Sequence, residues 1–199
     1  MKKLIFATTN EGKVTEVRSI LKDLDCEIVS LKDIDLVIDI DEDGDTFEEN
    51  AAIKARAIME LTGEMVLADD SGLEVDYLNK APGIYSARFL GKDTSYEVKN
   101  QYIIDKLADA KEKERSARFI CAVAFASPRG EITITRGTIE GFIGYEEKGG
   151  NGFGYDPIFY LPEYNCTTAE LSTEKKNEIS HRAQALREMK ETIISKLTK

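Results

Sequence analysis

The stretch "MVLADDSGLEV", residues 65–75, begins as an apolar strand and then places Asp69, Asp70, Ser71 and Gly72 in a row. Two carboxylates at the end of a buried strand repel each other unless a cation or a proton lies between them. Successive residues of a strand face opposite sides, so we expect the two aspartates to have different roles. The stretch therefore predicts a short strand that delivers a carboxylate to a reactive site.

Strand and helix patterns alternate outward from this stretch. Apolar runs of the strand type occupy residues 3–9 and 26–30, and apolar residues at helical spacing occupy residues 14–24. Beyond residue 117, two long β-branched and aromatic runs enclose "SPRG", which predicts a hairpin. A closing helix is expected from about Lys175. This order favours an α/β fold with a mixed central β-sheet flanked by helices, in an elongated, two-lobed single domain that spans residues 1–199.

Two capping signals define the starts of further helices. Thr46 with Glu49 three residues later is typical of a capping box, and Gly63 marks a plausible helix end. Thr94 with Glu97 predicts a second capped helix, which we expect to run to about Ala110.

Composition and charge exclude several classes of protein. The 199 residues are 42% hydrophobic and 32% charged, with a formal net charge of -10, which argues against a broad surface for nucleic acid or anionic membrane. No apolar run approaches the roughly 20 residues of a membrane span, and Leu4–Ala7 is too short for a signal peptide. Cys26, Cys121 and Cys166 lack metal-ligand spacing, so we expect reduced cysteines in a cytoplasmic protein.

The segment "TTNEGK" lies between the first predicted strand and the first predicted helix. Hydroxyl, amide and lysine side chains at a helix N-terminus bind phosphate oxygens well. The spacing of a P-loop is absent, and an ordinary strand-to-helix turn with a cap explains the pattern about equally well.

Carboxylates gather in the first seventy residues, and most of them belong to an acidic segment that precedes residue 50. Carboxylate oxygens suit Mg²⁺, which takes one or two of them and keeps waters and substrate phosphates as its other ligands. Most of these carboxylates are nonetheless expected to be solvated surface. The set comprises Asp41, Glu42, Asp43, Glu48, Glu49, Asp69 and Asp70.

Two stretches in the last third of the chain have residues suited to a nucleotide. "GGNGFGYDPIFY", residues 149–160, combines flexible glycines with the rings of Phe153 and Tyr155, which offer a face to a base or else belong to the core. "EKKNEISHRAQAL" contains the only histidine, His181. On one regular helix Lys176 and His181 lie roughly 140° apart, so they converge only if Lys176 precedes that helix.

Six stretches in register resemble the inosine triphosphate pyrophosphatase family, also called XTP/dITP pyrophosphatases. They are "ATTNEGK", "TFEENAAIKA", "ADDSGL", "PGIYSARF", "GFGYDPIF" and "EKKNEISHRAQAL". The resemblance implies hydrolysis of ITP, dITP or XTP to the monophosphate and pyrophosphate with Mg²⁺, by a homodimer whose subunits have a cleft between two lobes.

The resemblance also implies roles for individual residues. Asp70 is the expected proton acceptor for the attacking water, and Asp41 and Asp70 are the expected metal ligands. Glu42 remains an alternative to Asp41, because the family commonly has Glu at that position. The residues expected to bind substrate are Thr8, Thr9, Asn10, Glu11, Gly12, Lys13, Lys54, Ser71, Phe153, Gly154, Tyr155, Asp156, Lys176, His181 and Arg182.

Three alternatives stay open at this point. A related pyrophosphatase of similar fold acts on pyrimidine or methylated nucleotides, although "SHR" and "FGYDP" argue against it. A nucleotide-binding regulator would bind ITP without turnover, and a structural α/β module would do neither.

Overall fold

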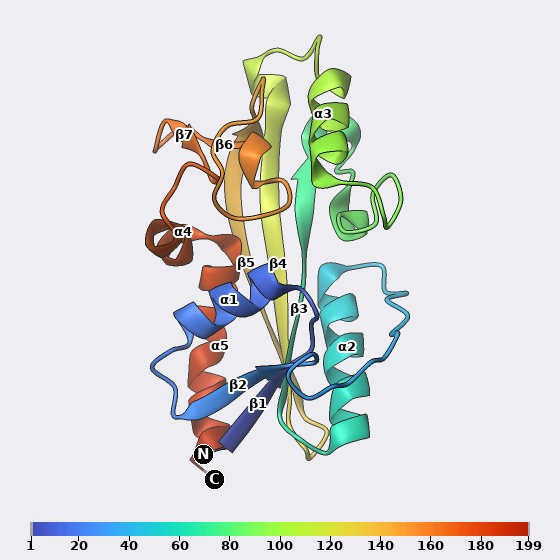
Figure 1. Cartoon of the computed structure of the whole chain (residues 1–199), viewed down its shortest axis with the longest axis vertical. Helices are drawn as coiled ribbons and strands as arrows, with labels where there is room; N and C mark the ends of the chain where they lie inside the picture. The colour runs from blue at the N-terminus through green and yellow to red at the C-terminus, as the bar shows by residue number, and fades with distance from the viewer. Residues whose placement is uncertain (1, 199) are drawn as a thin grey trace. The chain divides into compact units, whose positions relative to one another are not determined.

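One mixed β-sheet organises the chain, and the computed structural model describes it over residues 2–198 (Figure 1). The strand order is β2-β1-β3-β4-β5-β6-β7, in which β1 runs parallel to β2 and β3 and β6 runs antiparallel to β5 and β7. The expected mixed α/β fold is confirmed. The strands are β1 (Lys2–Phe6), β2 (Cys26–Ser30), β3 (Val66–Val75), β4 (Ser116–Ala126), β5 (Ile132–Ile143), β6 (Phe159–Leu161) and β7 (Cys166–Thr167).

Five α-helices accompany the sheet in the described residues. They are α1 (Glu11–Ile20), α2 (Phe47–Thr62), α3 (Tyr96–Lys106), α4 (Thr173–Ile179) and α5 (His181–Leu197). The chain divides into two compact units, and it passes between them within β3, β4 and β5 and again between α4 and α5. The first unit comprises the segment up to Asp70, residues 121–137 and the segment from His181, and the second comprises residues 71–120 and 138–180.

In the first unit, helices cover both faces of the sheet (Figure 1). Leu4, Phe6 and Leu67 belong to one buried cluster with apolar residues of α1 and α5. The alternate residues, such as Ile5 and Ala68, are equally buried and therefore face the opposite side, where Figure 1 shows α2. Each fully buried Leu or Phe side chain contributes roughly 1.5–3 kcal/mol. The β3 strand thus presents one face to α1 and α5 and the other face to α2.

Helix α5 begins directly against β5 at a glycine. A Cβ atom built on Gly137 would lie 2.0 Å from the His181 carbonyl oxygen and 2.8 Å from the Ala185 backbone nitrogen. No side chain fits in that space, so the glycine allows the first turn of α5 to rest on the strand. Thr135, two residues earlier on β5, donates its hydroxyl to the Ala185 carbonyl at 2.8 Å and fixes the same contact.

The second unit has its own core. Leu73 and Val75 of β3 pack in one cluster with Ile103 of α3 and Phe159 of β6, and all of these side chains are completely buried. Arg115 is buried as well, and its guanidinium donates to the Ile143, Leu107 and Gly144 carbonyls at 2.8, 2.6 and 2.6 Å. Those bonds offset the cost of burying its charge.

The first capping prediction is confirmed in part. Thr46 caps α2 by accepting from the Glu49 N–H at 3.1 Å, and Gly63 ends the helix in the left-handed conformation. The Glu49 carboxylate accepts from the Asp45 N–H, one residue before the cap, so the reciprocal bond of a capping box is displaced.

The second capping prediction is wrong by one residue. Ser95 is the cap of α3 and accepts from the Val98 N–H, while the Thr94 hydroxyl donates to the Leu90 carbonyl. The helix ends at Lys106 rather than near Ala110.

Two further expectations need correction. The expected strand "MVLAD" does not end at Asp69; β3 continues to Val75, because Leu73 and Val75 extend its alternating buried pattern into the second unit. The closing helix is not continuous from Lys175, since Ser180 is extended (φ -64°, ψ 158°) and separates α4 from α5. Serine competes for helix backbone bonds and favours such boundaries.

Candidate active site

The loop between β1 and α1 leaves the N-terminus of α1 open to solvent. The Asn10 side chain caps the helix by accepting from the Lys13 N–H at 3.1 Å, and the Asn10 N–H donates to the Thr8 hydroxyl at 3.2 Å. Thr9, Asn10 and Glu11 are exposed, and Thr8, Gly12 and Lys13 are half-buried. Helix N-termini attract anions through their unpaired N–H groups, so this loop fits the predicted phosphate-binding role.

Asp69 faces the α1 and α5 side of the sheet. The carboxylate is 2% exposed and lies 3.0 Å from Lys13 Nζ and 2.9 Å from Arg182 Nη2. Burial alone raises the pKa of Asp69, but the Lys13 and Arg182 charges more than offset that effect and hold the pKa well below its usual range. Asp69 is therefore an ion-paired carboxylate that links Lys13 of α1 to Arg182 of α5.

Arg182 is almost completely buried in the first turn of α5. Its Nε and Nη2 groups donate to Asp69, and its Nη1 group donates to Glu16 of α1. Burial lowers the pKa of Arg182, but the two carboxylates raise it above its ordinary value. Sequence reasoning missed Glu16, because a glutamate beside apolar Val14 and Val17 is an ordinary feature of an amphipathic helix.

Asp70 faces the α2 side, as expected for the neighbour of Asp69 in a strand. Its carboxylate is 7% exposed and accepts a bond from Asn50 Nδ2 at 3.3 Å, while Lys54 Nζ lies 3.7 Å away. Burial raises the pKa of Asp70, and the charges of Lys54 and Lys13 only partly counter this effect. Asp70 therefore takes up a proton more readily than Asp69 does.

The acidic segment approaches this carboxylate through Glu42. Lys54 of α2 lies 2.9 Å from Glu42 and 3.7 Å from Asp70, so the lysine bridges the two carboxylates. The Glu42 charge also contributes to the raised pKa of Asp70. Asp41 is exposed, and within residues 2–198 the ion pairs of Lys54 are with Glu42 and Asp70 rather than with Asp41. These contacts favour the alternative, Glu42, as the partner of Asp70.

In the second unit, Asp156 organises the glycine-rich loop. The carboxylate is 2% exposed, pairs with Lys176 Nζ at 2.5 Å and accepts from the Phe153 N–H at 2.8 Å. Gly152 has φ +75°, and a Cβ atom there would lie 2.2 Å from the Asp156 carboxylate. Asp156 therefore shapes the loop that presents Phe153, and the Lys176 ammonium lies 4.9 Å from the centre of that ring.

The two aromatic residues of this loop have different surroundings. Tyr155 belongs to the core, and its hydroxyl donates to the Ser86 carbonyl at 2.8 Å. Phe153 is only half-buried, so part of its side chain remains exposed. Gly154, also half-buried, accepts a bond from the Asn100 amide at 3.2 Å. The core interpretation holds for Tyr155, and the prediction of a stacking face stays with Phe153.

The remaining predicted residues lie at the boundaries of elements. Ser71 is half-buried within β3, next to Asp70. His181 is buried and begins α5, whereas Lys176 belongs to the preceding helix α4. The break at Ser180 satisfies the condition that Lys176 lies outside the helix of His181.

Solved structures identify the class of fold. A HAM1 protein from Coxiella burnetii matches with a TM-score of 0.87 and 41% identity, over 98% of this chain and 100% of that one. The Staphylococcus aureus Ham1 protein matches with a TM-score of 0.86 and 38% identity over the same shares.

Sequence comparison gives the family. Residues 4–192 match the Ham1 family. A protein named dITP/XTP pyrophosphatase from Exiguobacterium sibiricum is 50% identical over 187 residues, which is 94% of each chain. Another of that name from Desulforamulus reducens is 48% identical over 96% of this chain and 95% of its own. The chain belongs to the Ham1 family.

Proposed function

We propose that the protein hydrolyses non-standard purine nucleoside triphosphates, namely dITP, XTP and ITP, to the nucleoside monophosphate and pyrophosphate. The observation that carries this proposal is the similarity, at about half of all positions and over nearly the whole chain, to proteins named dITP/XTP pyrophosphatase. Geometry alone supports an anion site beside a carboxylate, and the relatives select the substrate class.

In this reaction the anhydride bond between the α- and β-phosphates breaks, and water supplies the new oxygen. A base must accept the proton that the water loses. Asp70 suits this role better than Asp69, because the pKa of its buried carboxylate is raised, whereas Lys13 and Arg182 lower the pKa of Asp69. Asp69 is a weak base, since Lys13 and Arg182 hold it ionised.

Mg²⁺ is the proposed cofactor, and Asp70 with Glu42 are its proposed protein ligands. The two carboxylates approach the same ammonium group of Lys54, so they already share one cation. In residues 2–198 no group of three or more His, Cys, Asp or Glu side chains is arranged to hold a metal. Mg²⁺ suits such a site because it needs only one or two carboxylates beside water and phosphate oxygens. The ion would supply charge neutralisation on the phosphates.

Residues of the chain supply the remaining positive charge and the base contacts. The open N-terminus of α1 with Thr8, Thr9 and Asn10 is proposed to hold phosphate oxygens. Lys13 and Lys54 place ammonium groups beside the two aspartates. Phe153 with Lys176 is proposed to contact the base.

Discrimination among purines is proposed to depend on the 6-position. A keto oxygen there accepts a hydrogen bond from a donor of the protein. The amino group of adenine is itself a donor, so it cannot bond to that protein donor. His181, Arg182 and backbone N–H groups are the proposed donors. Arg182 also donates hydrogen bonds to Glu16 and Asp69, which supports a role in positioning its surroundings as well.

A homodimer that acts in the cytoplasm completes the proposal. Among the described helices none has the length and apolar character to cross a bilayer. Light scattering coupled to size-exclusion chromatography measures the oligomeric state directly. A single monomer mass at micromolar concentration would contradict the dimer.

A nucleotide panel tests the function. dITP, XTP, ITP, dGTP, dATP, dTTP and UTP are incubated with and without Mg²⁺, and monophosphate, pyrophosphate and phosphate are separated by ion-exchange chromatography. We expect equal amounts of monophosphate and pyrophosphate from the first three substrates, only with Mg²⁺. Faster turnover of dTTP or UTP would favour the pyrimidine alternative. Saturable ITP binding without any product would favour a regulator.

A further inference from the structure

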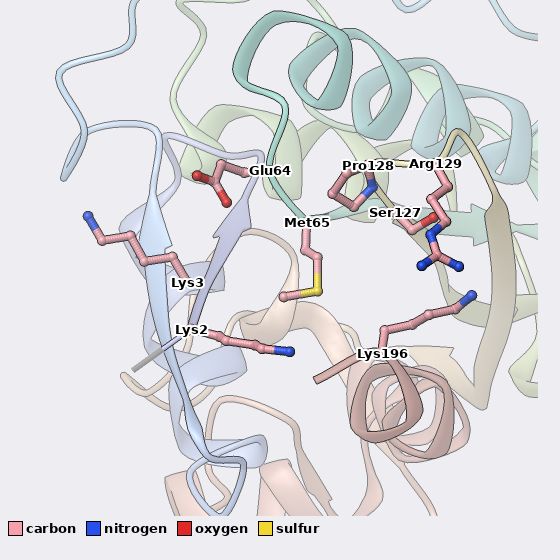
Figure 2. A pocket seen from close by; sticks show the side chains of 8 residues that line it. All are labelled: Lys2, Lys3, Glu64, Met65, Ser127, Pro128, Arg129 and Lys196. Carbon is pink, nitrogen blue, oxygen red and sulfur yellow. The ribbon is translucent and has the colours of Figure 1, made fainter. Parts of the chain in front are cut away.

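A pocket of about 650 Å³ lies at the other end of the strands in the first unit (Figure 2). It is lined where β1 and β3 begin and where the β4–β5 hairpin turns, together with the last turn of α5. The candidate active site lies at the opposite ends, since β1 leads into the phosphate-binding loop and β3 leads to Asp69 and Asp70. The pocket is therefore separate from the residues proposed for catalysis.

Positive charge gathers in this pocket. Lys2, Lys3, Arg129 and Lys196 line it, and Glu64 is the acidic residue among the described lining. Lys196 is paired with Glu131. When the charges of Glu64 and Glu131 are subtracted from the four basic side chains, an excess of two positive charges remains. The whole chain has a net charge of -10, which makes this local excess opposite in sign to the protein around it. Figure 2 shows Lys2 and Arg129 entering from different elements with Met65 between them.

A buried hydroxyl of the lining lacks a partner. Ser127 is 4% exposed, and its Oγ atom has no hydrogen bond within residues 2–198. Its backbone is fully used, because the Ser127 N–H donates to the Glu131 carbonyl and the Ser127 carbonyl accepts from the Gly130 N–H at 2.8 Å. This tight turn, with Gly130 at φ +81°, also fixes the backbone on both sides of Arg129. Buried hydroxyls are nearly always bonded, so the turn provides a donor for a ligand oxygen.

We propose that this pocket binds a diphosphate group, either inorganic or attached to a nucleoside. Phosphate oxygens accept from ammonium, guanidinium and hydroxyl donors together, which matches Lys2, Arg129 and Ser127. The cations come from separate chain segments, so a ligand with charge on two phosphorus centres engages them better than a single carboxylate does. The side chains of Met65 and Pro128 add apolar surface that suits an attached nucleoside.

The test is an NMR titration of the full ¹⁵N-labelled chain with pyrophosphate and without Mg²⁺. We expect saturable shifts of the Ser127 and Gly130 amide signals. The double variant K2Q/R129Q should weaken this binding by at least about tenfold, because it removes two charged donors to the phosphate oxygens. The amide signals of Asn10 and Gly12 report the active-site loop in the same spectra and should respond as in the unmodified chain.

The control variant K22Q/K92Q removes the same charge from two exposed lysines outside the pocket and should bind like the unmodified chain. Ser127→Ala should weaken binding by about threefold to tenfold. An ADP arm distinguishes the two sources: tighter binding of ADP than of pyrophosphate indicates nucleoside contacts, and equal binding indicates that the phosphates suffice.

Three results would overturn the proposal. The first is the absence of saturable shifts at Ser127 and Gly130. The second is an equal response to sulfate at matched ionic strength, which would mean general charge attraction. The third is equal weakening in the control variant. All three results are measurements of binding and do not require turnover. A failure of this proposal can therefore be told apart from a failure of the proposed hydrolysis.

Discussion

Asp69 and Asp70 are adjacent in β3, yet one faces α1 and α5 and the other faces α2. Asp69 lies between Lys13 and Arg182, and both of its oxygens accept from cations. The Asp70 carboxylate accepts a bond from the Asn50 amide at 3.3 Å, and Lys54 Nζ lies at the longer distance of 3.7 Å. The same chemical group is thus held ionised on one side of the sheet and driven toward protonation on the other.

This difference shows how one strand can hold a structural carboxylate on one face and a carboxylate with a raised pKa on the other. Strand alternation sends neighbours into layers with different charges, and the layers then set the pKa of each carboxylate. The ion pairs of Asp69 join α1 to α5, and the other side of the sheet holds Asp70, the proposed base. Each substitution below tests one half of the comparison.

Asp70→Asn should have the largest effect on activity. The amide cannot accept the proton of the attacking water, so we expect kcat/KM for dITP to fall by about a thousandfold. Folding should remain intact, because an amide in this environment avoids the cost of burying a charge. Pyrophosphate release and a thermal melt measure the two quantities. Activity within threefold of the unmodified enzyme, roughly 0.7 kcal/mol, would rule out the base assignment.

Asp69→Asn should have the largest effect on stability. It removes the buried carboxylate charge that pairs with Arg182 and Lys13, so we expect the free energy of unfolding to fall by about 3–5 kcal/mol. Urea denaturation followed by circular dichroism measures this change. An equal loss of stability in Asp70→Asn would erase the proposed contrast between the two aspartates.

Glu42→Gln compared with Asp41→Asn should separate the two candidates for the second metal ligand. Because Glu42 shares Lys54 with Asp70, we expect its variant to raise the Mg²⁺ concentration for half-maximal activity by about tenfold or more. Asp41→Asn, at an exposed position, should change it less than twofold, which is about 0.4 kcal/mol. The reverse order would restore Asp41 as the ligand.

Asn50→Ala should have the smallest effect. The Asn50 amide nitrogen donates to the Asp70 carboxylate, and the Asn50 amide oxygen accepts from the Gly44 N–H at 2.9 Å. The variant therefore loses one hydrogen bond to a carboxylate and one between neutral groups. We expect about 1–2 kcal/mol of lost stability and a threefold to tenfold lower kcat. Urea midpoints and initial rates measure both. An unchanged rate would show that Asn50 does not orient Asp70.

Much of the fold could be read from the sequence because its signals are local. Apolar periodicity located α1, β2 and the β4–β5 hairpin, and the threonine cap located the start of α2. The extension of β3 beyond Asp70 was missed because two aspartates, a serine and a glycine are typical of a strand end. Their burial depends on elements that pack on both faces, which no local pattern records.

Some contacts of the candidate site could be predicted from residue type and position. Asp70 and Lys13 could be singled out from motifs, and the opposite orientation of Asp69 followed from strand alternation. Glu16 could not be found, because its role depends on Arg182, which lies 166 positions away along the chain. The choice between Asp41 and Glu42 likewise depends on a contact with Lys54 that register alone does not determine.

Gly137 has no reactive group, yet any side chain at this position would collide with the His181 carbonyl. The first turn of α5 would have to shift, and that turn contains Arg182, the partner of Asp69. We therefore expect a substitution at this glycine to disturb the Arg182–Asp69 pair, although the glycine has no side chain in that pair. A screen limited to residues with reactive side chains would overlook Gly137. A screen that measures which side-chain volumes each position tolerates would detect it.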